Sequence, residues 1–93
     1  MKREILTADG LADALLTLDG WTVDGKVLKK RWTFENFADA LDFVNRVGVL
    51  AEAADHHPDI TFGWGYADLA LTTHDRGGIT GVDVALAKQI DAI

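Results

Sequence analysis

The chain has 93 residues, of which 48% are hydrophobic and 26% are charged, and its formal net charge is −6. This length and composition fit one globular domain over residues 1–93. The negative charge argues against nucleic acid as a partner, and the absence of cysteine excludes disulfides and a cysteine nucleophile. No apolar run approaches the roughly 18 residues of a membrane span, and no signal-peptide core follows the N-terminus, so we expect a cytoplasmic protein.

The first half of the chain predicts a helix followed by a β-hairpin. Leucine and alanine side chains recur at helical spacing over residues 8–18, with Thr7 as the expected N-cap. A short strand over residues 21–23 leads into Asp24-Gly25, a dipeptide that favours a tight hairpin turn. The returning strand alternates apolar and polar side chains over residues 28–34, so one of its faces should be buried.

The second half predicts a long helix, a second hairpin and a final helix. The long helix spans residues 35–55, and Pro58 prevents it from continuing further. Its apolar stripe is predicted to contain Phe34, Phe37, Leu41, Val44, Gly48 and Ala51. Alternating side chains predict a third strand over residues 59–64 and a fourth over residues 66–74. Thr80 is the expected N-cap of the last helix.

The order helix, two strands, helix, two strands, helix predicts an α+β fold. Two hairpins separated by a long helix form a four-stranded antiparallel sheet, and three helices stack on one of its faces as a two-layer sandwich. The other face is left to contact water, a ligand or a second subunit. The sheet is expected to have a solvated basic edge, formed by Lys26, Lys29, Lys30 and Arg31. The alternative is that this strand contacts DNA.

All three histidines of the chain lie at predicted boundaries between elements. His56 and His57 precede the proline that ends the long helix, and His74 ends the fourth strand. An imidazole can give and take a proton near neutral pH, and the adjacent Asp55 and Asp75 can orient it. In the plainer interpretation, the paired histidines only cap a helix terminus. A metal site is awkward, because adjacent residues in an extended chain point in opposite directions.

Other chemistries find less support in the sequence. There is no serine, which excludes a serine triad, and neither Gly63-Trp64-Gly65 nor Gly77-Gly78 has the spacing of a phosphate loop. Trp32 is expected in the core, whereas Trp64, close to a strand end, is the better candidate for stacking on a flat heterocycle. Asp83 is expected mainly to serve its own helix N-terminus.

The histidines belong to a longer pattern. An acidic residue, three spacers and His-His-Pro follow one another from Glu52 to Pro58, and a Thr-His pair ends the fourth strand. A glycine-rich loop then leads to Asp83, and Gly20-Trp21 and Arg31 also fit upstream. Together these motifs resemble the pterin-4a-carbinolamine dehydratase family over nearly the whole chain.

The resemblance implies an enzyme that dehydrates 4a-hydroxytetrahydropterin to quinonoid dihydropterin, in tetrahydrobiopterin recycling, without a metal or a cofactor of its own. It implies acid/base roles for His56, His57 and His74, with Glu52 and Asp83 in support. The residues expected to contact the pterin are Asp55, Thr72, Thr73 and Asp75, to which the stacking argument adds Trp64.

The resemblance also implies a homodimer or homotetramer, and it leaves a second function open. Some family members act as dimerisation partners of a transcription factor or as assembly factors, so the alternative is a non-catalytic protein-binding module on the same fold. Two departures bear on this choice. Ile60 stands where many members have an aromatic residue, for which Trp64 can compensate, and Asp68 interrupts a strand that is often more apolar or basic.

Overall fold

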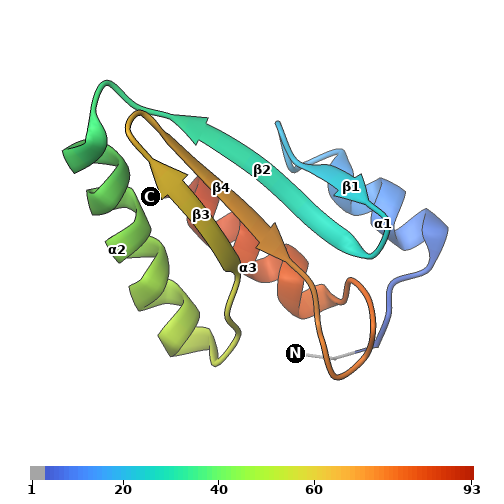
Figure 1. The fold of residues 1–93 in the computed structure, drawn as a ribbon. Helices are drawn as coiled ribbons and strands as arrows, with labels where there is room; N and C mark the ends of the chain where they lie inside the picture. Colours follow the sequence, from blue (N-terminus) through green and yellow to red (C-terminus); the bar gives the residue numbers. More distant parts are fainter. Residues whose placement is uncertain (1–3) are drawn as a thin grey trace.

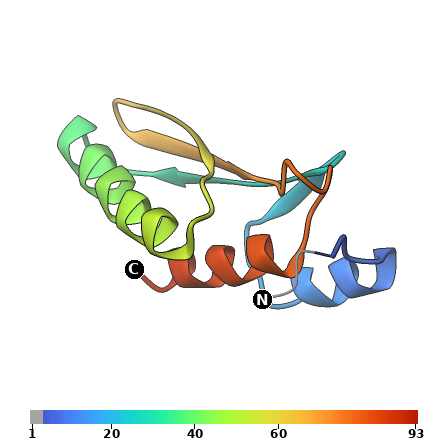
Figure 2. The ribbon, with the colours of Figure 1, turned by 90° about the horizontal axis from the view of Figure 1, so that it is seen from below.

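The computed structural model describes residues 4–93, which form three helices and four strands (Figure 1). The elements are α1 (Ala8–Leu15), β1 (Thr22–Asp24), β2 (Val27–Thr33), α2 (Phe37–Ala54), β3 (Asp59–Gly63), β4 (Tyr66–Leu71) and α3 (Gly81–Asp91). Neighbouring strands pair antiparallel in the order β1-β2-β4-β3. The helices lie on one face of the sheet (Figure 2), which confirms the predicted α+β sandwich. No helix within residues 4–93 is long and apolar enough to cross a membrane.

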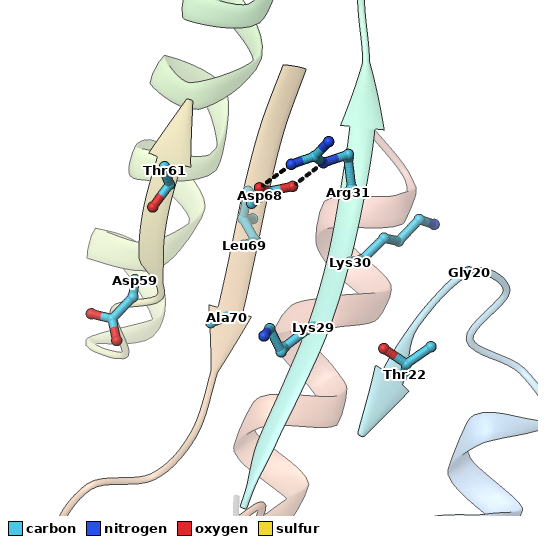
Figure 3. Close-up of a pocket in the computed structure, with 10 residues that line it drawn as sticks. All are labelled: Gly20, Thr22, Lys29, Lys30, Arg31, Asp59, Thr61, Asp68, Leu69 and Ala70. Atoms are coloured by element: carbon cyan, nitrogen blue, oxygen red, sulfur yellow. Dashed lines mark hydrogen bonds and ion pairs between the residues drawn. The ribbon is translucent and has the colours of Figure 1, made fainter. Parts of the chain in front are cut away.

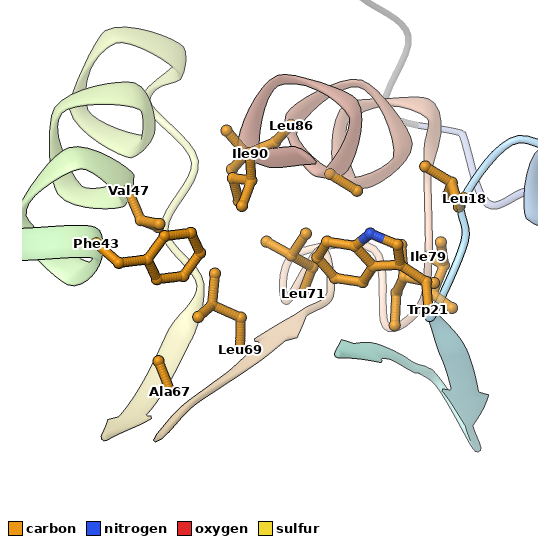
Figure 4. Packing of buried hydrophobic residues seen from close by; sticks show 12 residues of the cluster. Leu18, Trp21, Phe43, Val47, Ala67, Leu69, Leu71, Ile79, Leu86 and Ile90 are labelled. Carbon is orange, nitrogen blue, oxygen red and sulfur yellow. The ribbon is translucent and has the colours of Figure 1, made fainter. Parts of the chain in front are cut away.

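The core lies between the sheet and the helices (Figure 4). Leu28 of β2 and Leu69 and Leu71 of β4 are fully buried, and they belong to one cluster with Leu86 and Ile90 of α3. Buried side chains occur at every second position of β4, as the alternation predicted. The sheet is therefore held to α3 by apolar contacts, and the ends of its strands are fixed relative to the helix termini.

Helix α2 buries a different stripe from the predicted one. Its buried residues are Ala40, Phe43, Val47 and Ala51. Of the predicted stripe, only Ala51 belongs to this set, whereas Phe37 is 45% exposed and Leu41 is 39% exposed. The helix carries apolar residues on two adjacent sides, and only one side can face the sheet, so periodicity alone did not identify the buried one. The other side leaves an exposed apolar surface at Phe37 and Leu41.

Strand β2 lies between β1 and β4, so the prediction that its basic residues form a sheet edge is wrong. Lys30 reaches toward α3 instead of into solvent. Its Nζ donates a hydrogen bond of 2.7 Å to the carbonyl oxygen of Asp19 and pairs with Oδ1 of Asp91 at 2.8 Å. The ammonium also lies over the rings of Trp21 and Trp32. A charge is tolerated at this inner position because the long side chain carries it to polar partners at the margin of the core.

The open face of the sheet is hollowed and carries charges of both signs (Figure 3). The hollow has a volume of about 530 Å³ and includes Lys29, Asp59 and Thr61. Arg31 of β2 and Asp68 of β4 are cross-strand neighbours, and the guanidinium donates two hydrogen bonds to the carboxylate, at 2.6 and 2.8 Å. The acidic residue that departs from the family pattern is thus paired within the sheet.

Replacing Asp68 with asparagine should cause a small loss of stability that depends on pH. Hydrogen bonds from Arg31 lower the pKa of the Asp68 carboxyl in the folded protein. The pair therefore stabilises the fold above the ordinary carboxyl pKa, and this contribution is lost as the pH falls through the lowered folded-state value. The loss is small because both side chains are substantially exposed.

Urea unfolding of both proteins at neutral and at strongly acidic pH checks this expectation. The two curves should differ at neutral pH and coincide in acid. Asp59→Asn is the matched control, because Asp59 lies on the same face and makes no ion pair within residues 4–93. A destabilisation by Asp68→Asn that persists unchanged in acid would contradict the assignment.

Candidate active site

Two chain segments bring the three histidines together at one end of the sheet. Asp55 follows α2 in a left-handed conformation, with a φ of 49°, which short polar residues tolerate better than bulky ones. His56 and His57 lie in the turn that it starts, before β3 begins. β4 ends at Leu71, three residues earlier than predicted, and the chain beyond it carries His74. The residues that line the resulting hollow of about 250 Å³ are Asp55, His56, His57, Thr72, His74 and Asp75.

His56 is held from inside the protein. Its side chain is buried, and its Nε2 lies 2.5 Å from Oδ1 of the fully buried Asp83 in the first turn of α3. Asp83 also forms a capping box with Thr80, in which Oδ2 accepts a hydrogen bond of 2.9 Å from the Thr80 amide. One carboxylate therefore contacts both the helix N-terminus and the histidine, a position that suits the expected supporting role.

His57 and His74 have different surroundings from His56. His57 is exposed, and its Nε2 pairs with the carboxylate of Glu52 on the last turns of α2. The side chain of His74 is also exposed and makes no hydrogen bond or ion pair with residues 4–93. Three imidazoles thus share one hollow. The partner of His56 is a buried carboxylate, that of His57 is an exposed carboxylate, and His74 has no carboxylate partner within residues 4–93. Unequal surroundings are the means by which like groups take different proton-transfer roles.

The two threonines of the predicted site lie on different sides of the chain. Thr72 lines the hollow, and its hydroxyl donates a hydrogen bond of 2.7 Å to the carbonyl oxygen of Lys26. Thr73 is buried instead, with its hydroxyl 2.8 Å from both Oγ1 of Thr80 and Oδ2 of Asp83. Thr73 therefore does not line the hollow as predicted, but lies behind its wall and forms hydrogen bonds there. The prediction of Thr80 as the N-cap of α3 is confirmed, but its contact with Thr73 behind the site was not predicted.

Trp64 does not reach the hollow. It is 72% exposed and lies in the turn between β3 and β4. Figure 1 shows this turn at the opposite end of β3 from the segment that joins α2 to β3, which carries His57. Within one chain it therefore does not stack on a ligand beside the histidines, because the length of β3 separates them. Ile60 packs against the core, so the departure from the family at this position changes core contacts and not the lining of the hollow.

The groups around the hollow are suited to moving protons. They comprise three imidazoles together with the carboxylates of Asp55 and Asp75, within one concavity. Within residues 4–93, no three histidine or acidic side chains are grouped as metal ligands would be. Imidazoles in unequal environments can deliver a proton to one atom of a bound molecule and take one from another.

The sequence and its relatives agree on one family. The family model described as pterin 4 alpha carbinolamine dehydratase matches residues 4–93. A protein of Mycobacteroides abscessus is 46% identical over 87 residues, which cover 94% of this chain and 93% of that protein. A protein of Paracoccus denitrificans is 44% identical over 89 residues, which cover 94% of this chain and 83% of that protein. Both relatives carry the name pterin-4-alpha-carbinolamine dehydratase provisionally.

Two solved structures share the fold. One is described as a transcriptional coactivator/pterin dehydratase from Brucella melitensis, with a TM-score of 0.91 at 33% identity over 96% of this chain and 97% of its own. The other is described as a pterin dehydratase-like protein that is a RuBisCO assembly factor in the alpha-carboxysome. Its TM-score is 0.68 at 29% identity, and the match covers 78% of this chain and 87% of that one. By the family model and these likenesses, the chain belongs to the pterin-4a-carbinolamine dehydratase family.

Proposed function

We propose that this protein dehydrates 4a-hydroxytetrahydropterins to quinonoid dihydropterins, in the recycling of tetrahydrobiopterin. In this reaction the C4a–O bond breaks and the hydroxyl leaves as water, with a proton supplied by an imidazolium. A neutral imidazole takes the proton of N5, and the electron pair of that N–H bond forms the C4a=N5 double bond. Atoms and charge balance without an oxidant or a reductant.

The observation that carries the proposal is the convergence of His56, His57 and His74 on one hollow, each in a different environment. A flat ring placed there would have imidazoles from two chain segments beside it. Each proton transfer by a positioned side chain contributes roughly 10²- to 10⁴-fold to a rate. Asp55, Thr72 and Asp75 supply polar groups for the edge of the pterin ring, whereas Trp64 is too distant within one chain.

The proposal is tested by measuring dihydropterin formation from a freshly generated 4a-hydroxytetrahydropterin, with and without the protein. We expect the protein to accelerate dehydration in proportion to its concentration. A rate equal to the spontaneous rate at all protein concentrations would reject the enzyme.

The alternative is a non-catalytic protein-binding module on the same fold. Two observations favour it: the descriptions of the solved relatives as a coactivator and an assembly factor, and the exposed apolar surface at Phe37 and Leu41 of α2. The same surface and the open sheet face support the proposal of a homodimer or homotetramer, which light scattering of the purified protein would measure. The cytoplasmic location remains a prediction from the sequence.

A further inference from the structure

We propose that Thr73 and Thr80 are positioning residues that fix His56 with its proton on Nε2 and its Nδ1 as a proton acceptor facing the hollow. The inference rests on the proposed dehydration for its catalytic meaning, but its structural part concerns only this chain. The hydrogen bonds that carry it surround the buried carboxylate of Asp83.

The partners of Asp83 are all donors. Its Oδ2 accepts hydrogen bonds from the amide of Thr80 at 2.9 Å and from the hydroxyl of Thr73 at 2.8 Å. The N-terminus of α3 adds its partial positive charge at the same place. A carboxylate in these surroundings accepts at both oxygens, so Oδ1 is left to accept from His56.

The two hydroxyls then have only one consistent arrangement. Because Thr73 gives its proton to Asp83, its oxygen must act as the acceptor in the 2.8 Å contact with Thr80. The hydroxyl of Thr80 therefore donates to Thr73, while its oxygen accepts from the amide of Val82 at 3.2 Å. Both hydroxyls therefore donate in the same direction: Thr80 donates to Thr73, and Thr73 donates to Asp83.

The carboxylate that these donors hold in place determines the tautomer of His56. Its Nε2 faces an acceptor and must carry the proton, which leaves Nδ1 with a lone pair in the neutral ring. Nδ1 has no hydrogen-bond partner among residues 4–93, and no fully buried polar side-chain atom in that part of the chain lacks one, so Nδ1 keeps some solvent-accessible surface although the side chain as a whole is buried. His56 lines the hollow, and the free lone pair is available to a ligand there.

The test is the substitution Thr73→Val, which keeps the shape of the side chain and removes its hydroxyl, with Thr73→Ser as the matched control that keeps it. We expect Thr73→Val to lower kcat by about 10- to 100-fold, the effect of losing one hydrogen bond to a charged group, with little change in KM. Thr73→Ser should retain most of the wild-type kcat.

The second readout is the ¹⁵N NMR spectrum of the histidine side chains without substrate, at a pH where the rings are neutral. In the wild type and in Thr73→Ser, His56 should appear as a single tautomer protonated at Nε2, and in Thr73→Val as a mixture of both tautomers. A kcat of Thr73→Val within twofold of the wild type, or an unchanged tautomer in it, would overturn the proposal. A wild-type His56 protonated at Nδ1 would overturn it even if Thr73→Val does not fold.

The two readouts also separate this inference from the proposed function. A wild type with the expected tautomer and no dehydration would reject the enzyme alone. Dehydration by the wild type that is unaffected by Thr73→Val would reject the positioning role alone.

Discussion

Replacing His74 with alanine is expected to lower the dehydration rate by about 10²- to 10⁴-fold, the contribution of one positioned acid or base. The free energy of unfolding should change by less than about 0.5 kcal/mol, because the side chain is exposed and has no polar partner within residues 4–93. His74 is a cleaner target than His56, whose removal would leave the buried Asp83 without one of its donors. Steady-state dehydration rates and urea unfolding of the two proteins check the prediction.

A second variant, His74→Gln, shows what the imidazole contributes. Glutamine can form hydrogen bonds but does not exchange a proton near neutral pH, so this variant should be about as inactive as the alanine variant. Activity of either variant within a few-fold of the wild type, in a folded protein, would remove His74 from the reaction.

The largest expected effect on stability is that of Trp21→Ala, at about 3–5 kcal/mol. The side chain is 5% exposed and packs edge-on against Trp32, with ring centroids 5.4 Å apart. Its Nε1 donates a hydrogen bond of 2.9 Å to Asp91, the residue that also pairs with Lys30. The substitution therefore opens a cavity and disturbs the attachment of the end of α3 to β2.

Trp64→Ala is the matched control for this prediction, because it removes the same side chain from an exposed turn. It should change the free energy of unfolding by no more than about 0.5 kcal/mol. Urea unfolding followed by circular dichroism avoids relying on tryptophan fluorescence, which both variants alter. Equal destabilisation by the two variants would show that the positions assigned to these tryptophans are wrong.

The sequence predicted the order of the elements because local patterns decide it. The predicted hairpin forms, with Gly25 in the turn at a φ of 61° and Asp24 as the last residue of β1, and the alternation of β4 matches its buried leucines. The prediction of the buried side of α2 was wrong, because two adjacent sides of this helix are both apolar. Phe37 and Leu41 repeat with helical spacing as well as Ala40 and Phe43 do, and only the fit against the sheet chooses between them.

Long-range pairing explains the other differences. Lys30 looked like part of a solvated edge because its partner, Asp91, lies 61 residues away. The histidine cluster was predicted from its motifs, and the hollow does contain all three histidines. The position of Thr73 behind the site could not be predicted, because its partners, Thr80 and Asp83, lie at the N-terminus of α3 and not in the segment that carries Thr73.

The double use of Asp83, as helix cap and as partner of His56, ties the order of folding to the assembly of the site. His56 and Asp83 are 27 residues apart, and they meet only when α3 docks under the sheet. A fragment of the chain that stopped before Thr80 would contain all three histidines and still lack the carboxylate that holds the first of them. A nascent chain therefore carries every imidazole early and completes the site only with its last helix.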